Sequence, residues 1–169
     1  MSRTEDDRTV QVSQLLTGVA QAIATVRYCW LVTSEGTGIA NARPMGWLPR
    51  ALEADDWTIR FITDGRSEKA AEIRRAGKAT VIFQDAGNAF VTLAGAATLR
   101  DEASELRRLW KSAYDAYFPT AQDRANAALI EVDVQHMKLW IRGVGPEPFG
   151  LKPTKLERHG HGAWRAVQG

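Results

Sequence analysis

The arrangement of strand-like and helix-like segments limits the chain to few folds. Strand patterns cover residues 28–33, 39–47, 57–63, 79–84, 89–100 and 128–142, and helical patterns cover only 10–26, 67–77 and 101–117. The strands do not alternate regularly with helices and no Gly-x-Gly-x-x-Gly motif is present, so a doubly wound parallel sheet is disfavoured. Consecutive hairpins with crossover helices predict an antiparallel closed barrel, a mainly β fold with some α-helix (α+β).

Composition is that of an ordinary globular chain. Its 169 residues suit one domain spanning residues 1–169, with 44% hydrophobic and 25% charged residues. A net charge of +2 without a basic run disfavours nucleic acid, and no apolar run reaches membrane length. We therefore expect a cytoplasmic protein with a mobile lead over residues 1–9 and an irregular C-terminal tail over 143–169.

Cysteine and histidine usage disfavours a disulfide and a metal site. Cys29 is the single cysteine, which excludes an internal disulfide. It lies in an apolar strand pattern, which predicts a buried and inert thiol. The three histidines form no HExxH motif and no cluster with carboxylates, so no metal site is expected.

Residues 61–77 combine a strand end, a turn and a short helix with the features of an anion site. Ser67 stands at the N-cap position, where a helix presents free N–H groups and partial positive charge. Lys69, Arg66 and Arg74 are cationic neighbours. The segment is either the grip for a cofactor phosphate or an ordinary capped helix with a solvated basic face.

Arg43 is a second candidate for ligand binding. Proline cannot donate to a strand ladder, so Pro44 marks an edge, a bulge or a strand end. The residue before a proline is biased to extended geometry, which projects Arg43 sideways. The side chain either reaches a ligand or is exposed on a strand edge.

Two glycine positions carry structural predictions. Gly77 is a candidate C-cap for the short helix. Gly95, followed by Ala96 and Ala97, removes side-chain bulk in the middle of a long strand, which predicts a sharp bend or the close approach of another backbone or a ligand.

Several motifs in order carry a family resemblance, which covers roughly residues 10 to 165. The chain resembles the general stress protein branch of the pyridoxamine 5′-phosphate oxidase-like, FMN-binding split-barrel superfamily. The motifs are Ala42-Arg43-Pro44-Met45, Phe61-Ile62-Thr63-Asp64, Ser67-Glu68-Lys69, Val81-Ile82-Phe83-Gln84, Ala94-Gly95-Ala96-Ala97, Leu109-Trp110, Tyr117-Phe118-Pro119, Leu139-Trp140 and Pro146-Glu147-Pro148-Phe149-Gly150.

The resemblance implies a six-stranded antiparallel split β-barrel of Greek-key type with flanking helices. It also implies a homodimer with one FMN in each of two grooves at the interface. Ser67 and Lys69 would bind the phosphate, with Arg66 as a weaker candidate, and Ile62 and Thr63 would present backbone groups to the isoalloxazine edge. The full set of implied FMN-binding residues is Arg43, Pro44, Met45, Ile62, Thr63, Ser67, Lys69, Gln84, Trp110 and Trp140, the last two from the partner chain.

The implied activity is an FMN-dependent oxidoreductase that acts on a small molecule or a nicotinamide donor. No catalytic residue is identified. Residues 156–165 do not match the C-terminal arginine–histidine substrate motif of true pyridoxamine 5′-phosphate oxidases, so that reaction is not expected, and Arg158 and Arg165 are interpreted as surface charges. The alternatives are a non-catalytic stress protein that stores or sequesters FMN, a barrel that binds deazaflavin or haem, and a dimeric barrel with an empty groove.

Overall fold

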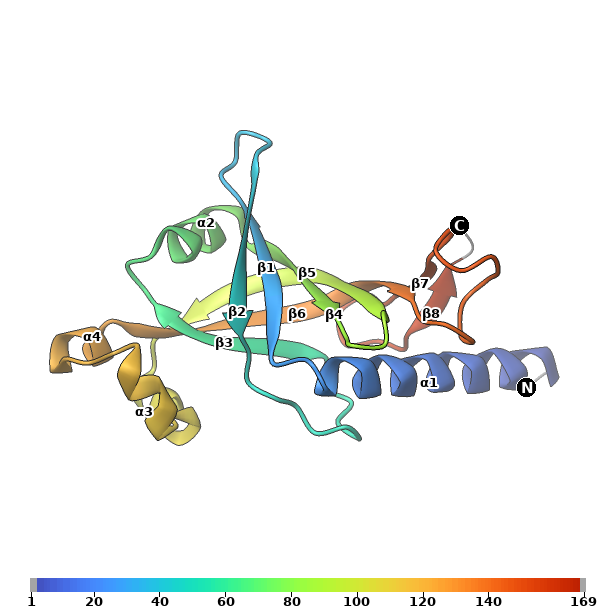
Figure 1. The fold of residues 1–169 in the computed structure, drawn as a ribbon, viewed down its shortest axis with the longest axis horizontal. Helices are drawn as coiled ribbons and strands as arrows, with labels where there is room; N and C mark the ends of the chain where they lie inside the picture. Colours follow the sequence, from blue (N-terminus) through green and yellow to red (C-terminus); the bar gives the residue numbers. More distant parts are fainter. Residues whose placement is uncertain (1–2, 168–169) are drawn as a thin grey trace.

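The computed structural model describes residues 3–167, which form one antiparallel sheet of eight strands with helices around it (Figure 1). The strands are β1 (Tyr28–Ser34), β2 (Ala40–Gly46), β3 (Thr58–Asp64), β4 (Lys78–Gln84), β5 (Phe90–Arg100), β6 (Ala127–Trp140), β7 (Thr154–Glu157) and β8 (Arg165–Val167). The helices are α1 (Arg3–Ala24), α2 (Glu68–Ala76), α3 (Ala103–Leu109), the 3-10 helix η1 (Ser112–Ala116) and α4 (Ala121–Ala125).

The sheet is open between β2 and β3. Its strand order is β2-β1-β4-β5-β6-β7-β8, and β3 pairs with β6. A single bridge joins the two sides, where the N–H of Leu48 donates to the carbonyl of Arg60 at 2.9 Å. Pro49 follows Leu48 directly and has no N–H with which to continue a ladder. The prediction of a closed barrel is therefore wrong.

The core lies on one face of the sheet, under α1. Alternation along the strands turns Leu31, Phe61 and Val132 inward, each fully buried. Helix α1 runs along the sheet and contacts β4, β5 and β8 (Figure 1). Val19 and Ile23 of its apolar stripe are fully buried, and Val12, Leu16 and Val26 are partly buried against the core, as the helical periodicity predicts.

A β-bulge bends the long β5–β6 pair. The register shifts between Ala94 and Gly95, where the backbone of Asp133 and Val134 comes close. A Cβ on Gly95 would lie 1.7 Å from the Asp133 carbonyl oxygen. The prediction that Gly95 allows a close backbone approach is confirmed.

The structure corrects two predicted helices. Helix α1 begins at Arg3, where a lead was expected; the first two residues of that predicted lead lie outside the described part. The helix predicted over 101–117 is broken into α3 and η1 at Trp110, which has an extended backbone. Helical spacing persists in the sequence across the break, so periodicity alone does not reveal it.

The C-terminal tail adds two short strands to the six that were expected, while residues 143–153 and 158–164 have no helix or strand. Strand β7 pairs with the end of β6 and β8 pairs with β7. Strands of three and four residues are too short to show an alternating pattern. Arg158 is buried, not a surface charge: its guanidinium donates to the carbonyl of Val134 and to Asp133 at 2.8 and 2.7 Å. Arg165 is exposed, as expected, and pairs with Glu157 at 2.5 Å.

Candidate cofactor site

The turn from β3 into α2 forms the centre of the candidate site. Ser67 has the extended backbone of an N-cap (φ −69°, ψ 157°) and Gly77 closes α2 with φ 65°, donating to the Ile73 carbonyl at 2.8 Å. The two predicted cap positions are confirmed. The Ser67 hydroxyl makes no capping bond, however, and its Oγ is buried without a hydrogen-bond partner among the described residues. A buried hydroxyl normally has a partner, so this one is suited to meet a ligand.

Two of the basic residues in this segment hold the turn itself. Arg66 donates to Asp64 at 2.6 Å and to Asp123 at 3.2 Å. The hydrogen bond from Arg66 lowers the pKa of Asp64 to about 2. Arg74 donates to the carbonyl of Gly65 at 2.7 Å. Because Arg66 already donates to two carboxylates, it is poorly placed to bind a phosphate, for which it was the weaker candidate.

Arg43 and Lys69 bring two positive charges close together. Burial lowers the pKa of Lys69, and the positive charge of Arg43 lowers it further. Arg43 is on β2, and its side chain is 21% exposed. It is therefore not a freely exposed edge residue. Two cations near a helix N-terminus with a free hydroxyl fit a phosphate, which takes charge-assisted hydrogen bonds.

Glu72 of α2 is a buried carboxylate that the sequence did not single out. It is 2% exposed, and its carboxylate accepts from the Thr33 hydroxyl, from the Asn41 amide at 2.5 Å and from Arg43 at 3.4 Å. Burial by itself would raise the pKa of Glu72, but the hydrogen bonds from Thr33 and Asn41 and the charge of Arg43 outweigh it, so the pKa is lowered.

Two further acidic side chains lie beside Glu72. The carboxylates of Glu35, Glu68 and Glu72 lie within 4.8 Å of one another, and Asn41 also donates to Glu35 at 2.9 Å. Amide and guanidinium donors therefore already serve this cluster. The signal that could have revealed Glu72 is its position three residues after Lys69, on the same side of α2 as Ile73.

The free edge of β3 offers backbone groups from Ile62. The Arg60 carbonyl points away from β6, because it accepts from Leu48. Residues two apart point the same way in a strand, so the N–H and C=O of Ile62 also face the open side of the sheet. Thr63 has the opposite parity and pairs with Ala128 of β6, and its side chain is buried. Ile62 is thus the one of the two whose backbone faces the open side in this structure, and the role of Thr63 at a cofactor stays a prediction.

The other predicted residues are spread over the sheet and α3. Pro44 is exposed on β2, while Met45 turns inward and packs on the core. Gln84 is exposed at the far end of β4. Trp110 packs edge-on against Phe118 in a separate cluster under α3, which Ile62 also contacts. Trp140 is the last residue of β6, at the other end of that strand from Ala127.

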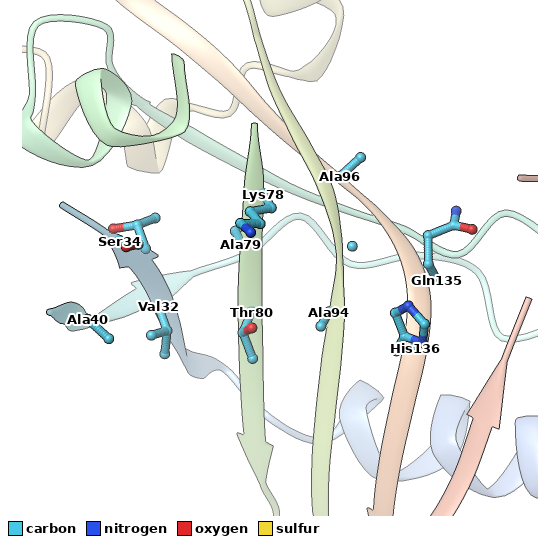
Figure 2. A pocket seen from close by; sticks show the side chains of 12 residues that line it. Val32, Ser34, Ala40, Lys78, Ala79, Thr80, Ala94, Ala96, Gln135 and His136 are labelled. Atoms are coloured by element: carbon cyan, nitrogen blue, oxygen red, sulfur yellow. The ribbon is translucent and has the colours of Figure 1, made fainter. Parts of the chain in front are cut away.

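Neither of two hollows in the described chain is lined by Arg43, Ser67 or Lys69. The first, of about 470 Å³, lies on the outward face of the sheet and is floored by small side chains (Figure 2). Its residues include Val32, Thr80, Ala94 and His136. The second, of about 610 Å³, lies between α3, α4 and the start of β6 and includes Trp110. These three residues therefore lie outside both hollows.

Comparison with known proteins identifies the family. A family model described as pyridoxamine 5′-phosphate oxidase like matches residues 15–156, which is most of the chain. The chain belongs to the pyridoxamine 5′-phosphate oxidase-like family. A search of curated proteins finds no match.

Solved structures share the fold at low sequence identity. A protein related to general stress protein 26 from Clostridium acetobutylicum has a TM-score of 0.68 at 14% identity, covering 85% of this chain and 94% of that one. A general stress FMN/FAD binding protein from Xanthomonas citri has a TM-score of 0.65 at 20% identity, and the match covers 83% of this chain and 96% of that one. A pyridoxamine 5′-phosphate oxidase-related, FMN binding protein from Nostoc punctiforme has a TM-score of 0.62 at 18% identity, and the match covers 94% of this chain and 95% of that one. The split-barrel fold is thereby confirmed as an open, mainly antiparallel sheet with helices.

The structure gives one finding on membranes. No helix in residues 3–167 is both long enough and apolar enough to cross a bilayer.

Proposed function

We propose that this protein binds FMN, with the phosphate at the start of α2. The observation that carries the proposal is the buried, unpartnered Oγ of Ser67 at the start of α2, with Lys69 two residues later and Arg43 in contact with Glu72 of the same helix. The first N–H groups of α2 add further donors. The names of the Xanthomonas and Nostoc proteins support a flavin as the ligand.

The residues around the free edge of β3 would serve the ring of the same cofactor. A flavin takes a flat slot with a few polar groups at its edge, and hydrogen bonds near N1 and N5 tune its electronics. Ile62 offers one backbone donor and one acceptor there. Bound FMN would supply two-electron transfer, which makes an oxidoreductase acting on a small molecule or a nicotinamide the proposed activity.

Pyridoxamine 5′-phosphate oxidation is not the proposed reaction. Arg158, one of the arginines of the C-terminal region, donates inward to Val134 and Asp133 and lies over the ring of Trp164, 4.9 Å from its centroid. It is therefore held in the fold and is not available to a substrate. A cytoplasmic location and a role in stress stay predictions, the latter supported by relatives described as general stress proteins.

We also propose that two copies pair through the outward face of the sheet. Tyr28 and Trp30 are 53% and 51% exposed on this face, opposite the buried Cys29 and Leu31. The hollow floored by Ala94 lies on the same face. An apolar face of this kind suits another copy of the chain, and the partner would complete a candidate site whose residues lie outside both hollows of one chain.

The proposal is tested by flavin binding. Purified protein should be yellow, and titration with FMN should quench flavin fluorescence. Lys69→Ala should weaken FMN binding roughly tenfold or more, since a hydrogen bond to a charged group is worth about 1.5–3 kcal/mol. Lys152→Ala, which removes an exposed lysine of the tail, is the matched control and should leave the affinity unchanged.

Two results would contradict the assignment. Absence of FMN binding would refute the cofactor, and equal affinity of Lys69→Ala and wild type would refute the phosphate site. Anaerobic bleaching of the bound flavin by NADH or NADPH, followed by turnover with an acceptor, would separate an oxidoreductase from a protein that only stores the flavin. A different visible spectrum would indicate deazaflavin or haem.

A further inference from the structure

Glu72 is a buried charge with a complete set of hydrogen-bond partners on the opposite strands. It projects from α2 toward β1 and β2, where Thr33 and Asn41 pair with each other across the ladder. Thr33 and Asn41 both donate to its carboxylate, and Arg43 approaches it to 3.4 Å. A buried carboxylate is costly unless it is paired in this way.

Thr33 links the carboxylate to the arginine. Its hydroxyl donates to Glu72 and accepts from Nη1 of Arg43 at 2.5 Å. Arg43 is therefore held at two nitrogen atoms, Nη1 and Nη2. A guanidinium has five N–H donors, so donors remain for another acceptor after these two bonds. The side chain keeps part of its surface accessible, at 21%.

The direction in which Arg43 is held is the informative feature. Its charge acts on Lys69, three residues before Glu72 on the same helix. Like charges repel, and the flexible arginine would otherwise turn toward water. Glu72 and Thr33 oppose that movement by anchoring the inner edge of the guanidinium. Lys69 lies one turn before Glu72 on the same face of α2, so the guanidinium that Glu72 anchors is held on the helix face that also carries Lys69.

We propose that Glu72, acting with Thr33 and Asn41, is a positioning residue that aims Arg43 at the phosphate of the cofactor. This inference rests on the proposed FMN site. Glu72 does not contact the ligand; it preorganises a side chain that does. Preorganised donors bind an anion more tightly because the ordering cost is met before binding.

The variants target the link without removing the cation. Thr33→Val is nearly isosteric and deletes the hydroxyl that joins Glu72 to Arg43, and Thr33→Ser keeps it. Glu72→Gln keeps the shape of the side chain and removes its charge. Each protein is titrated with FMN and with riboflavin, which has the same ring and no phosphate. Thermal unfolding of each variant checks that it is folded.

The expected result is selective for the phosphate. Thr33→Val and Glu72→Gln should weaken FMN roughly tenfold to a hundredfold, while riboflavin affinity stays within about twofold. Thr33→Ser should restore FMN affinity. Thr33→Val should have no further effect in an Arg43→Ala background, because the group that it positions is then absent. If Glu72→Gln does not fold, the comparison of Thr33→Val with Thr33→Ser still tests the inference.

The outcomes that would overturn the inference are distinct from failure of the proposed function. If wild type binds FMN and Thr33→Val binds it equally well, the positioning role is refuted while the FMN site stands. If Thr33→Val weakens FMN and riboflavin alike, the network is structural and the inference also fails. If wild type binds no FMN, the proposed function and this inference fall together.

Discussion

Replacing Gly95 by alanine should destabilise the protein more than any surface change of the same size. The added Cβ would lie 1.7 Å from the carbonyl oxygen of Asp133 and 2.7 Å from its carbonyl carbon. Real Cβ atoms do not approach closer than 3.0 Å, so the strands must separate by more than one ångström at this point. Both contacts are to backbone, and no side chain can rotate away to relieve them.

The size of the effect follows from what must move. Gly95 lies at the bulge where β5 and β6 change register, and β6 pairs with β3 and β7 on its other side. Overpacking a well-ordered site costs typically 1–3 kcal/mol, and we take about 3 kcal/mol because only backbone can yield. For a chain of this size that lowers the melting temperature by about 6–12 °C.

The same substitution at Gly18 provides the matched control. Gly18 lies in α1, and a Cβ there would have no atom within 4 Å. Alanine favours a helix over glycine by about 1 kcal/mol, so Gly18→Ala should raise stability. Urea unfolding and thermal melting followed by circular dichroism measure both variants. A Gly95→Ala protein that melts within about 2 °C of wild type would show that the bulge geometry is wrong.

Three further predictions concern acid stability, assembly and thiol reactivity. The pKa of Glu72 lies below its ordinary value of 4.5, and the pKa of Asp64 is lowered to about 2. Both carboxylates therefore stabilise the fold at a pH above their ordinary pKa values, and this stability is lost as the pH falls through the lowered pKa values. The urea midpoint of unfolding should therefore drop on acidification, and it should drop less in Glu72→Gln than in wild type. An equal drop in the two proteins would contradict this prediction. Trp30→Asp should convert the proposed dimer to a monomer in analytical ultracentrifugation, and an unchanged mass would refute that interface. Burial raises the pKa of Cys29 to about 12, so its thiol should resist alkylation at mildly alkaline pH until urea unfolds the chain, and rapid labelling of the folded protein would contradict the burial.

The fold was largely predictable because its signals are local. The strands that became β1, β3, β4, β5 and β6 alternate or run apolar over enough residues for a period of two to show. Gly77 and Gly95 were identified because glycine is required where φ is positive or where another backbone comes close. Arg43 and Lys69 were each singled out by a local feature, the proline after Arg43 and the helix start before Lys69, but only the family resemblance joined them in one site.

The remainder depends on contacts between distant residues. Glu72 reads in the sequence as one more polar residue of a short helix, and only folding brings it to Thr33, 39 residues away, and to Arg43, 29 residues away. Ile62 and Thr63 differ because the register of the β3–β6 pairing decides which backbone groups face β6 and which face the open side of the sheet. The sequence of one strand does not determine that register. The start of α2 was the part of the site visible in the sequence, and the buried network that holds Arg43 against it exists only once β1, β2 and α2 have packed together.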